Sequence, residues 1–432
     1  MRNLPNAPLC CKTFFEKIQK FFGKDTTTCS YVQEIVLAIA FLFQPKSNVV
    51  MSSIDRVRRS RQSFDKFFNR DSWSCQDFLA TMALVTLRSL GWREGEPLCV
   101  VIDDTQIEKR GKKMEGVSKT FLHSEKRFAD AHTVVTCALV YNGFTIPYGM
   151  RLFLSEQAFA QLATKDGWTK RPKMTELAAE LIASLRLPTS SQIVVLFDKY
   201  YLASNVVEAC VSRGYYYIGG VKENRLFAYR EKAPKSPIKG IVDNLIKWQG
   251  KRVKIEGSSL THRIAQATGW LKKVGKITLV CSRRKNEKRI LTLATNATFL
   301  TGKEVVKIYR DRWNIEVLFK SAKQYLGMGD YQLLKYRAVE KHLHLVMCAH
   351  CLLTHQTTLS FDEKEKKYRE SAPCRVGIYK AKIMFQNRVN NDVLIRIVNS
   401  KRYKGRSFIT ILKKLELMIA DNEDQAVMSM GA

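Results

Sequence analysis

Features that would place this chain in a membrane or outside the cell are lacking. Its longest apolar runs, at 35–43 and 344–355, are too short to cross a bilayer. The first twelve residues contain no apolar segment of the kind found in a secretory signal peptide. The eleven cysteines are odd in number and lie in a long chain, which does not indicate a disulfide framework. We therefore expect a protein of the reducing cytoplasm with no membrane association.

Acidic residues are also scarce relative to basic ones. The 432 residues include 40 Asp and Glu against 72 Lys and Arg, which gives a net charge of +32. Such an excess indicates a protein that binds a polyanion, most simply nucleic acid. Ribosomal and membrane-surface proteins share this sign of charge, but few combine it with this length and 45% hydrophobic residues.

The first 95 residues read as helical, and we expect this region to bind DNA. Apolar residues recur at helical spacing in the stretches 13–24, 30–43 and 72–91. A further stretch carries Arg56, Arg58, Arg59 and Arg61, which form either a solvated helix face or a contact with DNA. Gly91 suits the position that ends the last of these helices.

From residue 96 short apolar runs alternate with helical patterns, which predicts an α/β fold. Strands are expected within 97–105, 132–143, 144–154, 191–201 and 215–224, and helices within 173–187 and 202–214. Asn142–Gly143 predicts a hairpin turn between the second and third strands. The run that begins at Gln192 is apolar on both faces, as is typical of parallel strands flanked by helices.

The remaining chain divides into three further parts. Residues 225–300 contain a Pro/Lys stretch and a hairpin with a basic tip, Arg283–Arg289. A long helical pattern covers 302–327, an apolar helix covers 337–355, and an acidic tail ends the chain. We predict a helical DNA-binding region (1–95), a core in two parts (96–224 and 301–356), a β-rich insertion (225–300) and a C-terminal region for DNA binding or dimerisation (357–432).

One acid lies among cations in the segment 308–327. On a helix, Tyr309, Arg312, Glu316 and Lys323 fall within about 60° of one another, while apolar residues occupy another side. Two more acids, Asp103 and Asp198, follow apolar strands. Carboxylates from two adjacent strands and a helix would form an oxygen cage for Mg²⁺, with Mn²⁺ as a substitute. Two such ions suit in-line phosphoryl displacement, and the surrounding cations suit a DNA backbone.

These residues resemble the three acidic motifs of bacterial insertion-sequence transposases of the DDE type. The third motif is the signature Tyr309-x2-Arg312-x3-Glu316-x6-Lys323. The first is the apolar run before Asp103, and the second is the run before Asp198 followed later by Lys222-x-Asn224. All three occur in the family's order over residues 97–355, with a long insertion between the second and third.

The resemblance implies a ribonuclease-H-like core, in which helices flank a mixed sheet, together with a β-rich insertion domain. It implies cut-and-paste strand transfer at transposon ends. It assigns Asp103, Asp198 and Glu316 as catalytic metal ligands, with Asp104 as the alternative first acid. It also assigns DNA contacts to Tyr309, Arg312 and Lys323. Trp248 and Trp270 are candidates to hold a flipped base, although core packing is the favoured interpretation of each.

Several other residues invite a functional interpretation. Lys109, Arg110 and Lys222 lie next to the acidic motifs, and we expect them to contact phosphates, the alternative being solvated turns. The pair Cys348 and Cys351, with His350 and His355, has zinc-like spacing. Core packing is favoured for these four, because they lie in an apolar helix without a second cysteine pair. His132 is expected to be a structural histidine.

The leading hypothesis is a Mg²⁺-dependent DNA transposase, an endonuclease and strand transferase associated with a prokaryotic nucleoid. Its partners would be double-stranded DNA, at terminal inverted repeats and at target sites, and a second copy of itself, because two ends must be joined. Two alternatives remain open. One is a catalytically silent DNA-binding relative that acts as a repressor, and the other is a repair or junction nuclease on the same core.

Overall fold

The computed structural model describes residues 8–44, 47, 59–70, 73–111, 113–122, 125–166, 169–188, 192–256, 259–362, 365 and 367–399. The predicted acidic tail lies outside these residues. None of the helices within these ranges is long and apolar enough to span a membrane.

The N-terminal region is helical, as predicted. Its elements are η1 (Leu9–Cys11), α1 (Lys12–Phe22), α2 (Thr26–Phe41), α4 (Arg61–Asn69) and α5 (Cys75–Ser89). Helix α2 begins four residues earlier than expected, because the Asp25 side chain accepts a hydrogen bond from the backbone N–H of Thr28 at 3.0 Å and caps it. Gly91 follows α5 with φ of +91°, in agreement with its predicted position.

The predicted arginine cluster is only partly within the described residues, since Arg56 and Arg58 lie outside them. Arg59 forms an ion pair with Glu34 at 3.1 Å, and its guanidinium lies 3.6 Å from the centroid of the Tyr31 ring. This arginine therefore packs helix α2 against the chain before α4.

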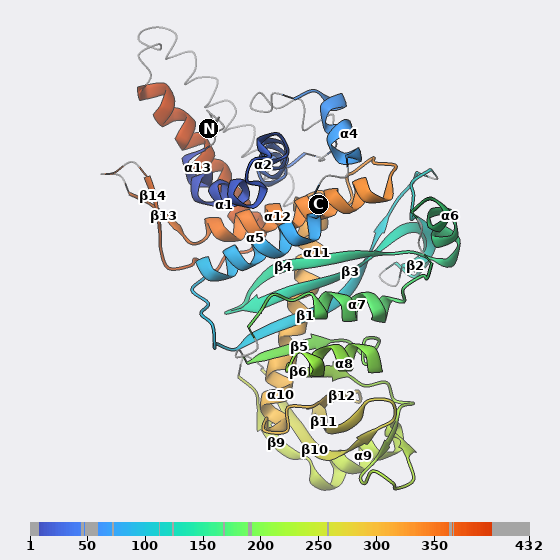
Figure 1. Cartoon of the computed structure of the whole chain (residues 1–432). Coiled ribbons are helices and arrows are strands. Elements are labelled where there is room, and N and C mark those ends of the chain that lie inside the picture. The colour runs from blue at the N-terminus through green and yellow to red at the C-terminus, as the bar shows by residue number, and fades with distance from the viewer. Residues whose placement is uncertain are drawn as a thin grey trace.

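The core of the molecule is a mixed α/β arrangement built on one large sheet (Figure 1). Its first six strands and the helices between them are β1 (Leu98–Glu108), β2 (Ser118–Leu122), β3 (Arg127–Tyr141), β4 (Phe144–Phe153), α6 (Glu156–Asp166), α7 (Met174–Ala183), β5 (Ile193–Phe197), α8 (Ser204–Ser212) and β6 (Tyr216–Gly220). Strands β4, β3 and β1 pair antiparallel, and β1, β5 and β6 pair parallel.

Two sequence predictions about this sheet are confirmed. The turn between β3 and β4 has positive φ at both Asn142 (48°) and Gly143 (77°), which is the conformation that this residue pair favours in hairpins. Strand β5 is the parallel strand, with partners on both sides, that its apolar sequence indicated. Strand β2 and helix α6 were not predicted.

Residues 225–300 extend the same sheet instead of forming a separate one. They hold β7 (Leu226–Ala228), β8 (Ser236–Pro237), α9 (Ile238–Gln249), β9 (Lys251–Lys254), β10 (Thr261–Leu271), β11 (Gly275–Arg284) and β12 (Ile290–Thr295). Strand β12 pairs antiparallel with β6, so the hairpin β11–β12 joins the edge of the core. Strand β10 and helix α9 were missed by the sequence analysis.

The long helical pattern after the insertion is divided by a tighter turn. It consists of α10 (Gly302–Tyr309), the 3₁₀ turn η2 (Arg310–Trp313) and α11 (Asn314–Tyr325). Figure 1 shows α11 crossing one face of the sheet, while α7 and α8 lie over the other. The chain continues with α12 (Tyr336–Gln356), β13 (Leu359–Asp362), β14 (Lys367–Glu370) and α13 (Ile378–Asn399).

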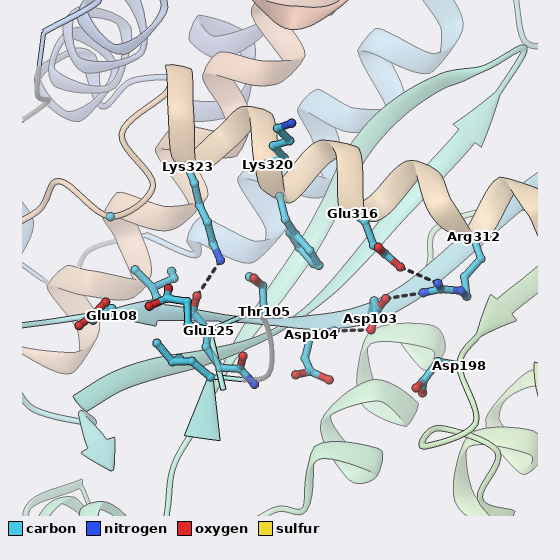
Figure 2. Close-up of a pocket in the computed structure, with 15 residues that line it drawn as sticks. Asp103, Asp104, Thr105, Glu108, Glu125, Asp198, Arg312, Glu316, Lys320 and Lys323 are labelled. Carbon is cyan, nitrogen blue, oxygen red and sulfur yellow. Dashed lines mark hydrogen bonds and ion pairs between the residues drawn. The ribbon is translucent and has the colours of Figure 1, made fainter. Parts of the chain in front are cut away.

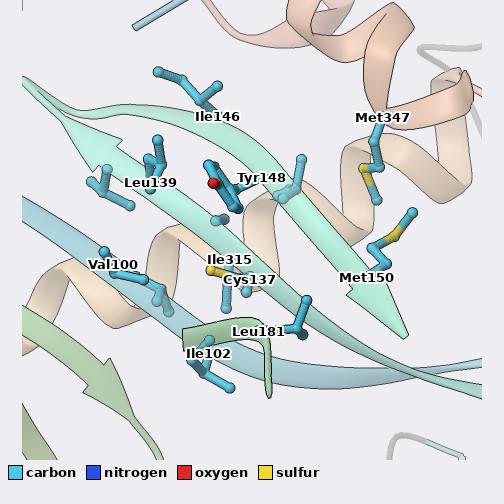
Figure 3. Close-up of a cluster of buried hydrophobic side chains, with 14 of the residues drawn as sticks. Val100, Ile102, Cys137, Leu139, Ile146, Tyr148, Met150, Leu181, Ile315 and Met347 are labelled. Atoms are coloured by element: carbon cyan, nitrogen blue, oxygen red, sulfur yellow. The ribbon is translucent and has the colours of Figure 1, made fainter. Parts of the chain in front are cut away.

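A single hydrophobic cluster joins these parts. It runs from Cys10 to Val389 and includes side chains of the N-terminal helices, the sheet and α12. At its centre, Val100 of β1, Tyr148 of β4 and Ile315 of α11 are fully buried (Figure 3). Helix α12 is buried almost throughout and contacts α2, α5 and β4. The N-terminal helices therefore share a core with the sheet that carries the acids.

Candidate active site

A cavity of about 770 Å³ lies between β1 and α11 (Figure 2). The three acids singled out from the sequence line it, each from a different part of the chain. Its charged lining residues are Asp103, Asp104, Glu108, Glu125, Asp198, Arg312, Glu316, Lys320 and Lys323. The fold thus brings Asp103, Asp198 and Glu316 to one opening.

The register of the parallel strands explains why two of these acids are neighbours. The pairing of β1 with β5 ends at Ile102 and Phe197, so the next residues, Asp103 and Asp198, lie at the same level. Strand β1 does not stop there, because it continues to pair with β3 as far as Glu108. The expectation that Asp103 closes its strand is therefore wrong, although Asp198 does follow the end of β5.

Asp103 and Asp104 have different environments. Successive side chains of a strand point to opposite faces. Asp103 faces α11, where its Oδ2 accepts a hydrogen bond from Arg312 at 2.7 Å (Figure 2). Asp104 accepts one from the Tyr201 hydroxyl at 2.9 Å. Only Asp103 therefore lies on the side of the sheet from which Glu316 approaches.

Asp198 is held by the turn that follows β5. Its Oδ1 accepts hydrogen bonds from the backbone N–H groups of Tyr200, at 2.7 Å, and of Tyr201, at 3.4 Å. This local bonding is typical of an aspartate at the start of a turn. It orients the carboxylate before any ligand binds.

The four residues of the helical motif connect α10 and α11 to the strands that carry the acids. Arg312 donates to Asp103 and also to Glu316, at 2.5 Å. The Tyr309 hydroxyl donates to the carbonyl of Phe197, next to Asp198, at 3.3 Å. Lys323 donates to the carbonyl of Gln106 on β1 at 2.7 Å. The predicted stripe thus faces β1 and β5. Of the residues expected on the apolar side, Leu318 is buried and does not line the cavity, whereas Phe319 is buried but lines the cavity beside Glu316.

Burial dominates the electrostatics of the first acid. It raises the pKa of Asp103 to about 7, even though Arg312 and the N–H of Asp104 both favour the ionised form. The negative charges of Asp104 and Asp198 raise this pKa further. Several acids around one partly buried opening therefore carry an electrostatic cost that a bound cation would relieve.

The donor types at the cavity fit a hard divalent cation, because all three acids offer carboxylate oxygens. Within the described part of the chain, however, no three Asp, Glu, His or Cys side chains are gathered closely enough to hold a metal ion. Arg312 is bonded to two of the three carboxylates. The ligand chemistry is therefore present, while two of the acids are engaged with an internal cation.

The predicted phosphate contacts divide into buried and exposed residues. Lys109 is only 7% exposed, and its ammonium donates to the carbonyls of Gly329 (2.5 Å) and Tyr331 (3.1 Å). Its expected contact with phosphate is therefore corrected, because the side chain turns inward and joins β1 to the chain after α11. Arg110 and Lys222 are exposed, as a phosphate contact requires.

The tryptophan predictions are also modified. Trp248 is 76% exposed on α9, so the favoured interpretation as a core residue is wrong for it. Trp270 is half-buried on β10. Sequence reasoning missed Trp313, which is 62% exposed directly after Arg312. It lines a second cavity together with Lys307, Arg310 and other cations. Its place inside the helical motif was the signal available.

The two structural interpretations agree with the packing. Cys348, Cys351, His350 and His355 are all buried in α12, and burial lowers the pKa of His350 to about 3. His132 is buried, with its ring nitrogens 2.7 Å from the Tyr331 hydroxyl and 2.9 Å from the Glu115 carbonyl.

Comparison with known proteins identifies the class to which this chain belongs. Residues 20–241 match the model of the DDE superfamily endonucleases, and residues 164–352 match that of the transposase DDE domain. The first match includes Asp103 and Asp198, and the second includes Asp198 and Glu316. The chain therefore belongs to the DDE superfamily of endonucleases, and it is a DNA transposase.

A named relative agrees with this assignment. The chain is 22% identical over 330 residues to the probable transposase for insertion sequence element IS701 of Microchaete diplosiphon, covering 72% of this chain and 79% of the relative. Membership of this family implies an enzyme that acts on DNA and uses a divalent metal.

Proposed function

We propose that this transposase moves an insertion sequence by cutting and rejoining DNA at its terminal inverted repeats, with Asp103, Asp198 and Glu316 as its metal-binding catalytic acids. The observation that supports the assignment is their convergence on one cavity from β1, the end of β5 and α11. Asp103 is preferred to Asp104 because it faces α11.

In this proposal the acids would hold two Mg²⁺ ions, for which Mn²⁺ could substitute. Bound there, such ions would supply an activated water and charge stabilisation at the attacking and leaving oxygens. The chain's own contribution is orientation. Asp198 is held by the backbone N–H groups of its turn, and Asp103 by its place in β1. The apolar side of α11 sets the height of Glu316 above the sheet.

The cations near the acids would position DNA without reading its sequence. Lys323 and Lys320 line the cavity, and Arg110 and Lys222 are exposed close to the acidic strands. Tyr309 and Arg312 stand beside the acids and would contact the strand near the cleaved end. Lys109 is left out of this set because its ammonium is buried.

The wider organisation is proposed on the same basis. We propose that the strands in the order β4-β3-β1-β5-β6 form a ribonuclease-H-like core, into which residues 225–300 are inserted; the mixed sheet flanked by helices supports this. The helical region 1–95, and the C-terminal region 357–432, would bind the transposon ends or a second subunit. A homodimer on DNA follows from the need to join two ends, and association with the nucleoid from the net charge of +32.

The test is cleavage of DNA that carries the ends of the insertion sequence. Asp198→Asn and Glu316→Gln should each lower the rate of strand cleavage in Mg²⁺ by at least about a hundredfold, because each removes a ligand charge from the proposed site. Binding of the same DNA without metal should change little.

Glu208→Gln is the matched control, since Glu208 is exposed on α8 and lies outside the cavity lining. It should cleave at the wild-type rate. Wild-type cleavage by either acid variant would refute the proposed assignment.

A further inference from the structure

Arg312 lies between two of the proposed metal ligands. Its Nη1 is 2.7 Å from Oδ2 of Asp103 and its Nη2 is 2.5 Å from Oε1 of Glu316. The side chains of Arg312 and Asp103 are each 16% exposed. One planar guanidinium therefore bridges carboxylates from β1 and α11, a geometry that suits the fork of arginine and that a lysine ammonium reproduces poorly.

The bridge engages the oxygens that a metal ion would use. Oδ2 of Asp103 bonds to Arg312, and Oδ1 accepts from the backbone N–H of Asp104 at 3.0 Å. Both oxygens of this carboxylate therefore already have donors. A divalent cation shared by Asp103 and Glu316 would lie next to the Arg312 guanidinium. The cation and the guanidinium would then repel each other strongly, because the site is partly buried.

A second cavity offers the Arg312 side chain an alternative binding partner. It lines the second cavity, between η2 and the β11–β12 hairpin, together with Arg284, Lys307, Arg310 and Arg375. These five cations face only two acids there, Glu256 and Asp311. The excess of positive charge suits a polyanion. The Arg312 guanidinium can bind a phosphate bidentately, as it can a carboxylate. A DNA phosphate at this cavity would therefore compete with Asp103 and Glu316 for Arg312.

We propose that Arg312 takes the place of a metal ion between Asp103 and Glu316 in the DNA-free protein, and that DNA draws it away before metal binds both acids. This inference rests on the proposed role of those acids. Metal binding and DNA binding are then coupled, and each strengthens the other. The transposase holds metal weakly until its substrate is present.

The test measures Mn²⁺ binding to the full chain without DNA, from the electron paramagnetic resonance signal of the free ion. Arg312→Gln should bind Mn²⁺ about tenfold more tightly than wild type, because the competing charged hydrogen bonds are gone. Arg312→Lys should bind at an intermediate strength, since it keeps the charge and loses the bridge. It also serves as the test if the glutamine variant does not fold, as judged by circular dichroism.

Lys320→Gln is the control for charge. Lys320 is exposed and lines the same cavity but is not bonded to Asp103, Asp198 or Glu316, so this change removes one positive charge and leaves the bridge in place. Its Mn²⁺ affinity should stay within about twofold of wild type, because an exposed charge is screened by solvent. An equal gain in Lys320→Gln and Arg312→Gln would overturn the inference, since net charge alone would then explain it.

A second arm adds a duplex of mixed sequence, with Mn²⁺ binding to the DNA alone subtracted. Wild type should gain Mn²⁺ affinity and Arg312→Gln should gain none, because it has no bridge to release.

The proposed function is tested separately by Glu316→Gln, which should lose Mn²⁺ binding. If Glu316→Gln binds like wild type, the metal site itself is wrong. If it loses binding while Arg312→Gln equals wild type, only the bridge is refuted.

Discussion

Asp103 and Asp104 are adjacent in sequence and have the same side chain, yet strand β1 directs these side chains to opposite faces of the sheet. Asp103 bonds to Arg312 on the α11 side, whereas Asp104 bonds to the Tyr201 hydroxyl. An amide at position 104 would keep an oxygen that accepts from Tyr201, so the polar contact there survives the loss of charge. At position 103 the loss of charge removes the ionic partner of Arg312 and a proposed metal ligand.

Asp103→Asn should therefore abolish cleavage in Mg²⁺, while Asp104→Asn should keep it within about tenfold of wild type. Parallel cleavage assays on DNA that carries the transposon ends check this difference. The opposite ranking would make Asp104 the first catalytic acid and would require β1 to present its other face to the metal.

One side of helix α11 packs in the core, and the other side lines the cavity. Leu318 and Ile315 are buried in the hydrophobic core, while Glu316 and Lys323 line the cavity. A carboxylate on a helix is positioned only as well as the helix is packed. If Glu316 is a catalytic acid, as proposed, the apolar side of α11 would contribute to catalysis without touching substrate, through the position of Glu316 relative to β1.

Leu318→Ala should lower the free energy of unfolding by about 2–5 kcal/mol, because it leaves a cavity under α11. Val317→Ala, one residue away on the exposed side of the same helix, should change it by less than about 0.5 kcal/mol. Urea unfolding followed by circular dichroism measures both. Equal effects of the two changes would show that α11 is not held by the packing described.

The whole molecule carries an excess of 32 positive charges, which should make its affinity for DNA depend on salt concentration. Each phosphate neutralised by a protein cation releases counterions, so affinity falls steeply as salt is added. The charge does not act evenly, however, because cations such as Lys109 are buried among carbonyl groups while Arg110, the next residue, is exposed.

Arg110→Gln should reduce the slope of log affinity against log salt by about one, the value for one lost phosphate contact. Lys109→Met should leave the slope unchanged, because its ammonium does not reach the surface. Fluorescence anisotropy with a labelled duplex at several salt concentrations gives both slopes. A loss of slope in the Lys109 variant alone would contradict the buried position of that side chain.

Local patterns predicted most of the elements but not all of them. Strands β1, β3, β4, β5 and β6 and helices α7, α8 and α12 follow from apolar runs and helical periodicity, and the hairpin turn follows from Asn142–Gly143. Strand β10 was missed because its sequence mixes polar and apolar residues with a glycine near its end. Helix α9 was missed because it follows a stretch rich in proline and lysine.

The sequence by itself determined the class of this protein, since three acids, their neighbouring cations and the net charge all depend on residue identity and spacing along the chain. Tertiary structure alone decided which aspartate faces α11, that Lys109 turns inward, and that Arg312 bridges two carboxylates. These depend on strand register and helix packing between segments far apart in the chain. No local pattern encodes such distances, because they result from how the whole core packs.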